Sequence, residues 1–141
     1  LNGQRWDAAV TVRPKLGDLE VWHLVNTTDD AHPIHLHLVR FQVLDRQGFD
    51  VAGYLKGWGA QRPGEGPDPI PVEPYLRGKR VAPPPQERGW KDTVRADPRE
   101  VVRIIARFEG YAGKYPWHCH MLEHEDNEMM LRFEVVGPTG I

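Results

Sequence analysis

Short apolar or alternating segments, separated by turn residues, run through most of this chain. We predict strands over Ala8–Val12, Leu19–Val25, Ile34–Leu44, Val101–Phe108, Lys114–His120 and Met130–Val136. No window sustains a helical period, although Met121–Met130 can hold a short helical turn. Many short strands joined by turns are typical of an antiparallel β-sandwich, so the expected fold class is all-β.

The segment from Gly48 to Gly89 departs from this pattern. It is rich in glycine and proline and contains the triplet Pro83-Pro84-Pro85. Because proline cannot donate to a strand ladder, this segment cannot form a central strand, and we predict a long Pro/Gly-rich loop. Such a loop is either a tolerated surface insertion or the border of a substrate site.

Composition limits the classes of function. The 141 residues fit one compact domain, and 40% hydrophobic residues are enough for a core. A net charge of −2 offers no basic field for nucleic acid or an anionic membrane, and no apolar run is long enough to span a membrane. The chain begins at Leu1 without an initiator methionine, so we expect it to come from within a longer protein.

Six of the 7 histidines lie in two short windows. They are His32, His35 and His37 in the first window and His118, His120 and His124 in the second. The second window also holds Cys119, which is the only cysteine and therefore excludes an internal disulfide. His23 lies apart, between two apolar residues, and we interpret it as structural.

Strand alternation gives the second window two faces. Side chains of a strand point alternately to opposite sides, so His118 and His120 would face one side and Cys119 the other. One short segment could therefore serve two metal centres that are joined covalently through its backbone. That connection is what an electron relay requires.

The ligands around Cys119 indicate the metal on its side. His124 and Met129 follow it in sequence, and His32 is the natural donor of a second imidazole. Two histidines, one cysteine and a weak axial methionine form the blue-copper arrangement. Zinc would more often take paired cysteines or a set of four Cys and His ligands, and this chain has no second cysteine.

The other face would collect imidazoles. His35 and His37 have the same spacing as His118 and His120, so we expect all four on one surface. Imidazole suits copper, zinc, iron or nickel, and copper is favoured beside a blue-copper site.

Two stretches of this sequence resemble the C-terminal copper motifs of multicopper oxidases. They are HPIHLHLVRF and HCHMLEHEDNEMM, and they are most similar to those of bacterial spore-coat laccases and bilirubin oxidases. The GWKDT run at Gly89–Thr93 resembles the same branch. The resemblance covers essentially the whole chain and implies one Greek-key, cupredoxin-like domain over residues 1–141, the third and C-terminal domain of such an enzyme.

The resemblance also implies a ligand set and an activity. It places His32, Cys119, His124 and Met129 at type 1 copper, His35 at type 2 copper, and His37, His118 and His120 at type 3 copper. Type 1 copper would take single electrons from phenols, aromatic amines or bilirubin-like pigments, and the trinuclear cluster would reduce dioxygen to water. An axial Met129 implies a modest type 1 potential.

Further expectations concern what surrounds these ligands. Cys119 and His124 would be catalytic residues. Glu125 matches an acid of the family that would relay protons, and the alternative is a solvated surface acid. The family's oxygen-reducing cluster takes twice as many histidines as the motifs here supply. Type 1 copper would therefore be held wholly by this chain, whereas type 2 and type 3 copper would be shared with N-terminal cupredoxin domains. The family also implies an extracytoplasmic or spore-coat location.

Three other functions stay open at this point. The chain could be a stand-alone blue-copper electron carrier, part of a copper nitrite reductase, or a structural partner domain. A carrier has no use for four further histidines at these spacings. A nitrite reductase normally places one metal-binding histidine beside its cysteine, and a structural domain would bind no copper tightly.

Overall fold

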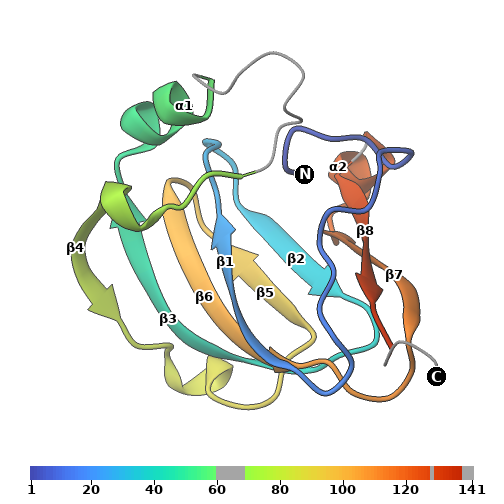
Figure 1. Cartoon of the computed structure of the whole chain (residues 1–141). Helices are drawn as coiled ribbons and strands as arrows, with labels where there is room; N and C mark the ends of the chain where they lie inside the picture. Colours follow the sequence, from blue (N-terminus) through green and yellow to red (C-terminus); the bar gives the residue numbers. More distant parts are fainter. Residues whose placement is uncertain (60–68, 128, 138–141) are drawn as a thin grey trace.

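Two four-stranded antiparallel sheets face each other in the computed structural model, which describes residues 1–59, 69–127 and 129–137 (Figure 1). The first sheet has the order β1-β6-β3-β4, with β1 at Leu19–Val25, β6 at Glu100–Arg107, β3 at Phe41–Phe49 and β4 at Leu76–Val81. The second sheet has the order β5-β2-β7-β8, with β5 at Thr93–Ala96, β2 at His32–Leu36, β7 at Gly113–Cys119 and β8 at Met130–Val135. The expected cupredoxin-like sandwich is thereby confirmed.

The main core fills the space between the two sheets. Strand alternation turns one face of each strand inward, and Phe41, Ile104 and Phe133 are each 0% exposed there. Burying a side chain of this size stabilises the fold by about 1.5–3 kcal/mol. Cys119 is also 0% exposed and belongs to the same core cluster, so its sulfur is enclosed by the main core.

Most predicted elements are confirmed. β1 has the predicted bounds, β6 and β7 each begin and end one residue before their predictions, and β8 ends one residue early. The short helix α2 at Leu122–Asp126 lies in the predicted helical turn. β5 had no counterpart among the predictions. It is only 4 residues long, which leaves too little periodic signal.

The predicted strand over Ile34–Leu44 is wrong as a single element. The chain leaves β2 after Leu36 and enters β3 at Phe41, and these two strands lie in different sheets. Leu38 adopts a φ of 72°, a left-handed conformation that breaks an extended strand. The alternating apolar pattern continues across the break because both strands face the same core.

The predicted loop over Gly48–Gly89 contains regular structure. Helix α1 occupies Val51–Gly59, and β4 pairs along the outer edge of β3, with short 3-10 turns at Glu73–Tyr75 and Pro85–Glu87. The Asp50 carboxylate accepts a hydrogen bond from the Gly53 amide at 2.9 Å, which caps the helix start. Tyr54 is 1% exposed and anchors α1 in a second, smaller core. Residues 60–68 of this loop lie outside the described residues.

The predicted strand over Ala8–Val12 is also wrong. The segment runs beside β8 and supplies carbonyl acceptors to it. The Val12 carbonyl accepts from the Glu134 amide at 3.0 Å, and the Pro14 carbonyl accepts from the Val136 amide at 2.9 Å. Pro14 has no amide hydrogen to donate, which interrupts the ladder that a strand would need.

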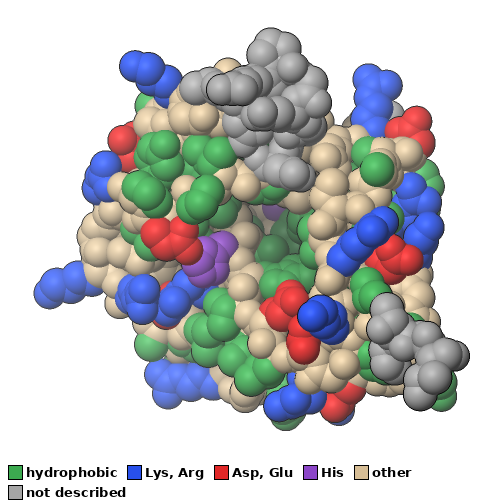
Figure 2. Space-filling view, in the orientation of Figure 1, with side chains coloured by type: hydrophobic (Ala, Val, Ile, Leu, Met, Phe, Trp, Pro, Cys, Tyr) green, Lys and Arg blue, Asp and Glu red, His purple; other side chains and the backbone are tan. Residues whose placement is uncertain are grey.

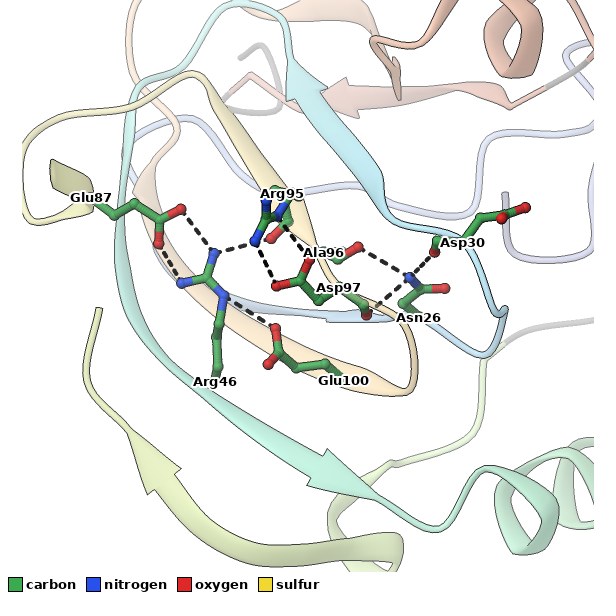
Figure 3. A network of polar contacts seen from close by, with 8 residues as sticks. All are labelled: Asn26, Asp30, Arg46, Glu87, Arg95, Ala96, Asp97 and Glu100. Atoms are coloured by element: carbon green, nitrogen blue, oxygen red, sulfur yellow. Dashed lines mark hydrogen bonds and ion pairs between the residues drawn. The ribbon is translucent and has the colours of Figure 1, made fainter. Parts of the chain in front are cut away.

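Arg46 ties the two sheets together at one end (Figure 3). From β3 its guanidinium donates to the Glu87 carboxylate and, at 3.0 Å, to the Arg95 carbonyl on β5. Its Nε lies 3.1 Å from Glu100 Oε1 on β6. These charge-assisted contacts fix one end of the sandwich, and the connection from β1 to β2 lies at the same end.

Candidate metal centre

Strands β2 and β7 bring the two histidine windows together. They pair antiparallel, with Ile34 opposite Cys119 and His35 opposite His118. Directly paired residues project to the same side of a sheet. Cys119 therefore lies on the core side, and His35 and His118 lie together on the other side, as the alternation of β7 predicts.

The core side holds a sulfur cluster, formed by His32, Cys119 and His124. Cys119 Sγ lies 3.7 Å from Nδ1 of His32 and 3.7 Å from Nδ1 of His124. The two Nδ1 atoms are 3.0 Å apart. Three potential ligand atoms thus converge on one point, from β2, from β7 and from α2.

Backbone hydrogen bonds position Met129 and helix α2 around this cluster. The Cys119 amide donates to the Met129 carbonyl at 3.0 Å, and the Met129 amide donates to the His124 carbonyl at 3.0 Å. Met129 is half-buried and packs against the main core. The loop from Cys119 through α2 therefore returns on itself, which places residues five and ten positions later beside the cysteine.

The opposite side holds an imidazole cluster, formed by His35, His37 and His118. Their candidate ligand nitrogens all lie within 4.8 Å of one another. Nε2 of His37 is 3.3 Å from Nε2 of His118. His120 lies just after β7, exposed, with its ring 5.6 Å from that of His35 and 5.5 Å from that of His118, centroid to centroid. All four predicted imidazoles therefore gather on one surface.

Carbonyl acceptors fix the ring nitrogens of this imidazole cluster. His118 Nδ1 donates to the Cys119 carbonyl at 3.0 Å, and His35 Nδ1 donates to the Asp92 carbonyl at 2.9 Å. Since a carbonyl can only accept, Nδ1 carries the proton in both rings and Nε2 keeps its lone pair. Thr93 Oγ1, 3.0 Å from His35 Nδ1, reinforces the second contact. Such partners orient metal-binding imidazoles.

Burial favours the uncharged forms of several of these groups. The pKa of His32 lies below its usual value through burial and then through the nearby His124. The pKa of His37 is lowered by burial and then by its histidine neighbours. Burial also raises the pKa of the Cys119 thiol, against a hydrogen bond from the Met121 backbone that lowers it. Neutral imidazoles suit metal binding, whereas the buried thiol needs a cation to stabilise its thiolate.

A cleft of about 700 Å³ opens between the two sheets and reaches the sulfur cluster. Figure 2 shows this hollow with hydrophobic side chains inside it. His32 and Met129 lie in its wall together with Trp22 and Trp117.

Comparison with known proteins agrees with this geometry. A family model described as multicopper oxidase matches residues 2–138. The chain belongs to this family. Within it, the present chain is the C-terminal domain, and its sulfur and imidazole clusters are those expected of copper sites.

Laccases are among the similar curated proteins. The chain is 48% identical over 138 residues to a laccase of Bacillus subtilis, covering 98% of this chain and 24% of that protein. It is 46% identical over 141 residues to a laccase of Haloferax volcanii, covering 99% of this chain and 19% of that protein. This multicopper oxidase domain thus spans about a quarter or less of the curated relatives it matches.

Solved multicopper oxidases have the same fold. A laccase from Pediococcus acidilactici superposes with a TM-score of 0.65 at 30% identity, covering 95% of this chain and 23% of that one. A multicopper oxidase from Campylobacter jejuni gives a TM-score of 0.68 at 24% identity, covering 96% and 22%, and supports the fold alone.

The donor atoms of this multicopper oxidase domain fit copper. Ligand nitrogens and sulfurs lie about 2.0–2.3 Å from a transition-metal ion of this size. Two atoms bound to one ion can therefore be up to about 4.6 Å apart. The separations of 3.0 and 3.7 Å in the sulfur cluster meet that limit. Two imidazoles with one buried thiolate are a soft donor set that copper prefers.

Two other predicted residues stand apart from the clusters. His23 lies on β1, and its Nδ1 is 3.4 Å from Glu73 Oε1, which fits the structural role expected of it. Glu125 is half-buried on α2, directly after His124.

No helix among the described residues is long and apolar enough to cross a membrane.

Several contributors were not singled out from the sequence. Asp92 and Thr93, which hold His35, lie in the GWKDT run, so a resemblance already pointed at their position. Thr28 contacts His32, and Asn26 contacts Thr28. Both lie in a polar stretch that has no pattern of its own.

Proposed function

We propose that this chain is the copper-binding C-terminal part of a laccase-like oxidase, which couples one-electron oxidation of small aromatic reductants to four-electron reduction of dioxygen. His32, Cys119, His124 and Met129 would hold type 1 copper, His35 type 2 copper, and His37, His118 and His120 type 3 copper. When bound, copper supplies the redox chemistry. Four electrons and four protons convert one dioxygen to two waters, so four one-electron donors are oxidised in each turnover.

One observation carries this proposal. Cys119 belongs to one cluster and His118 to the other, and the two residues are adjacent in sequence. His118 also donates a hydrogen bond to the Cys119 carbonyl at 3.0 Å. The chain therefore offers both a covalent and a hydrogen-bonded connection between the two sites. An electron carrier that served only the sulfur cluster would have no need for the second one.

The imidazole cluster supports a shared site. His120 is exposed, and His35 and His37 are only half-buried, so this surface can accept further ligands from another domain. We infer that preceding cupredoxin domains supply the remaining histidines, as the relatives' greater length allows. An extracytoplasmic or spore-coat location remains an expectation from the family, which fractionation of the producing cells would test.

The proposal is tested in two steps. Copper added to this chain should produce an intense visible absorption from the Cys119 thiolate. The same domain within its full-length protein should then consume oxygen with phenolic or aromatic amine substrates, at four one-electron oxidations per dioxygen. A blue chain whose full-length protein never consumes oxygen would instead favour the electron carrier.

Glu125 is proposed as the proton relay. It follows His124 and lies on the helix that begins two residues after His120. Glu125→Gln in the full-length protein should slow oxygen reduction and shift its pH profile, because the amide cannot deliver a proton. Glu123→Gln, an exposed acid of the same helix, serves as the control. Equal pH profiles for both variants would refute the relay.

Met129 is proposed to set the reductant class. A weak thioether ligand favours the oxidised metal, and its loss should raise the type 1 potential. Redox potentiometry of Met129→Leu, with the exposed Met121→Leu as control, measures this shift. An unchanged potential would contradict an axial role and the preference for electron-rich phenols and aromatic amines that we derive from it.

A further inference from the structure

The ring of His32 is held from behind by a short chain of polar side chains. Its Nδ1 faces Cys119 Sγ and His124, whereas its Nε2 lies 2.8 Å from Thr28 Oγ1. Thr28 Oγ1 in turn lies 2.8 Å from Asn26 Oδ1. Both polar residues belong to the connection between β1 and β2, and neither was expected to take part in the site.

Asn26 has only one possible amide orientation. Its Nδ2 lies 2.7 Å from the Asp30 carbonyl, 3.1 Å from the Ala96 carbonyl and 3.0 Å from the Asp97 carbonyl. Dashed lines mark these three contacts in Figure 3. Only the nitrogen of the amide can donate to carbonyl oxygens, so Oδ1 must face Thr28. Asn26 is 5% exposed, and its backbone amide donates to Glu100 at 3.0 Å, so this orientation is firmly anchored.

The orientation of Asn26 decides where the Thr28 proton points. Asn26 Oδ1 can only accept, and two oxygens 2.8 Å apart need a proton between them, so the Thr28 hydroxyl donates to Asn26 Oδ1 rather than to the Asp30 carbonyl at 3.2 Å. The Thr28 oxygen then has lone pairs left for His32. The contact at Nε2 is therefore a donation from His32 Nε2–H to Thr28 Oγ1.

We propose that Asn26 and Thr28 form a relay of hydrogen bonds that holds His32 in its Nε2–H tautomer, so that the Nδ1 lone pair is directed at the sulfur cluster before the metal arrives. Thr28 is thus a positioning residue of the site, and Asn26 acts through it. Like the acceptors that orient metal-binding imidazoles elsewhere, Thr28 also makes the ring a stronger donor. This inference rests on the proposed assignment of copper to the sulfur cluster.

The His124 side of the cluster has a different arrangement. Its Nδ1 lies 3.0 Å from His32 Nδ1, and only one of two such nitrogens can carry the proton of a hydrogen bond between them. If Thr28 keeps the proton of His32 on Nε2, the shared proton belongs to His124. His32 is then the ligand whose Nδ1 lone pair is already directed at the cluster, whereas His124 Nδ1 donates in the contact between the two rings.

The tautomer can be read without copper. Nitrogen chemical shifts of the metal-free chain distinguish an Nε2–H imidazole from an Nδ1–H one. We expect His32 in the Nε2–H form in the unaltered chain and in Thr28→Ser, which keeps the hydroxyl. In Thr28→Val we expect this preference to be lost. An Nδ1–H His32 in the unaltered chain would overturn the proposal whatever any variant does.

Copper binding gives the second measurement. Thr28→Val should bind copper about 10–100-fold more weakly, the usual effect of removing such an acceptor. Its type 1 potential should shift upward, because a poorer imidazole donor stabilises the oxidised metal less. Thr27→Val is the matched control, since the described residues show no hydrogen bond from the Thr27 side chain. Equal affinity of the two valine variants would overturn the relay.

The two proposals fail in different ways. A chain that binds copper without the visible thiolate absorption contradicts the proposed function. A chain with that absorption whose copper affinity and His32 tautomer do not depend on Thr28 contradicts only the relay. Thr28 is exposed, so its replacement by valine leaves the main core intact, and circular dichroism of each variant checks the fold.

Discussion

The two clusters of this domain lie on opposite faces of one sheet and differ in how completely they are built. The sulfur cluster is enclosed, with Cys119 at 0% and His32 at 6% exposure, and its ligands come from two strands and a helix of this chain. The imidazole cluster is half-open, with His120 exposed at its rim. In the proposed function, this domain alone completes the electron-accepting site, whereas another domain completes the site for dioxygen.

The largest expected effect separates the two clusters outright. Cys119→Ser removes the only thiolate, so the visible thiolate absorption and substrate-driven oxygen consumption by the full-length protein should both be lost completely. The imidazole cluster should still bind copper, because its ligands lie on the other face of the sheet. Visible spectroscopy with copper quantification checks both statements. Loss of metal from both clusters would show that they form a single binding unit.

The reciprocal change tests the open cluster. His37→Ala should remove a ligand of the imidazole cluster and weaken copper binding there, while the thiolate absorption persists. The reason is geometric, since Nε2 of His37 lies 3.3 Å from Nε2 of His118 and His37 is not part of the sulfur cluster. His23→Ala is the control, a histidine in the other sheet. A bleached thiolate absorption in His37→Ala would contradict the separation.

The sheet β1-β6-β3-β4 contains no residue of either cluster. A change in it should therefore lower the stability of the whole domain and affect both clusters alike. Asp45 on β3 accepts hydrogen bonds from Arg103 on β6, and this side-chain contact is the main reason that the pKa of Asp45 is lowered. Asp45→Asn should lower the free energy of unfolding at neutral pH by about 1.5–3 kcal/mol. Chemical denaturation of the metal-free chain measures the loss.

The pH dependence of the same pair has a definite sign. Because the folded pKa of Asp45 lies below its unfolded value of 3.8, its contribution is fully present above that value. It is lost as pH falls through the lower, folded pKa, and Asp45→Asn should abolish this acid-induced loss. Asp29→Asn is the control, since Asp29 meets Arg99 with 81% of its side chain exposed. Equal effects of the two variants would contradict the prediction.

The smallest effect concerns the orientation of one ligand. Thr93→Val removes one of two acceptors of His35 Nδ1, while the Asp92 carbonyl at 2.9 Å remains. We therefore expect the copper affinity of the imidazole cluster to fall less than the about 10–100-fold that follows when an imidazole loses its only acceptor. Competition titration compares Thr93→Val with Thr28→Val. A larger loss for Thr93→Val would reverse this order.

Much of the site was readable from local sequence. The period of two along Lys114–His120 was enough to predict that Cys119 and its flanking histidines face opposite sides, and the pairing of β7 with β2 agrees with this. The same pattern misled over Ile34–Leu44, because alternation persists across the break at Leu38 when two strands share one core. Helix α1 was missed because glycines at positions 53, 57 and 59 weakened its helical signal.

The sequence by itself determined which residues could bind a metal and how they divide between two faces, since side-chain alternation follows from the covalent geometry of an extended chain. The tertiary structure alone decided that Ile34 pairs with Cys119, because the register of strands about 80 residues apart depends on packing of the whole core. It also decided which nitrogen of His35 faces the imidazole cluster. That choice depends on the Asp92 carbonyl, which is 57 residues away in sequence and reaches the ring only once the sheets are assembled.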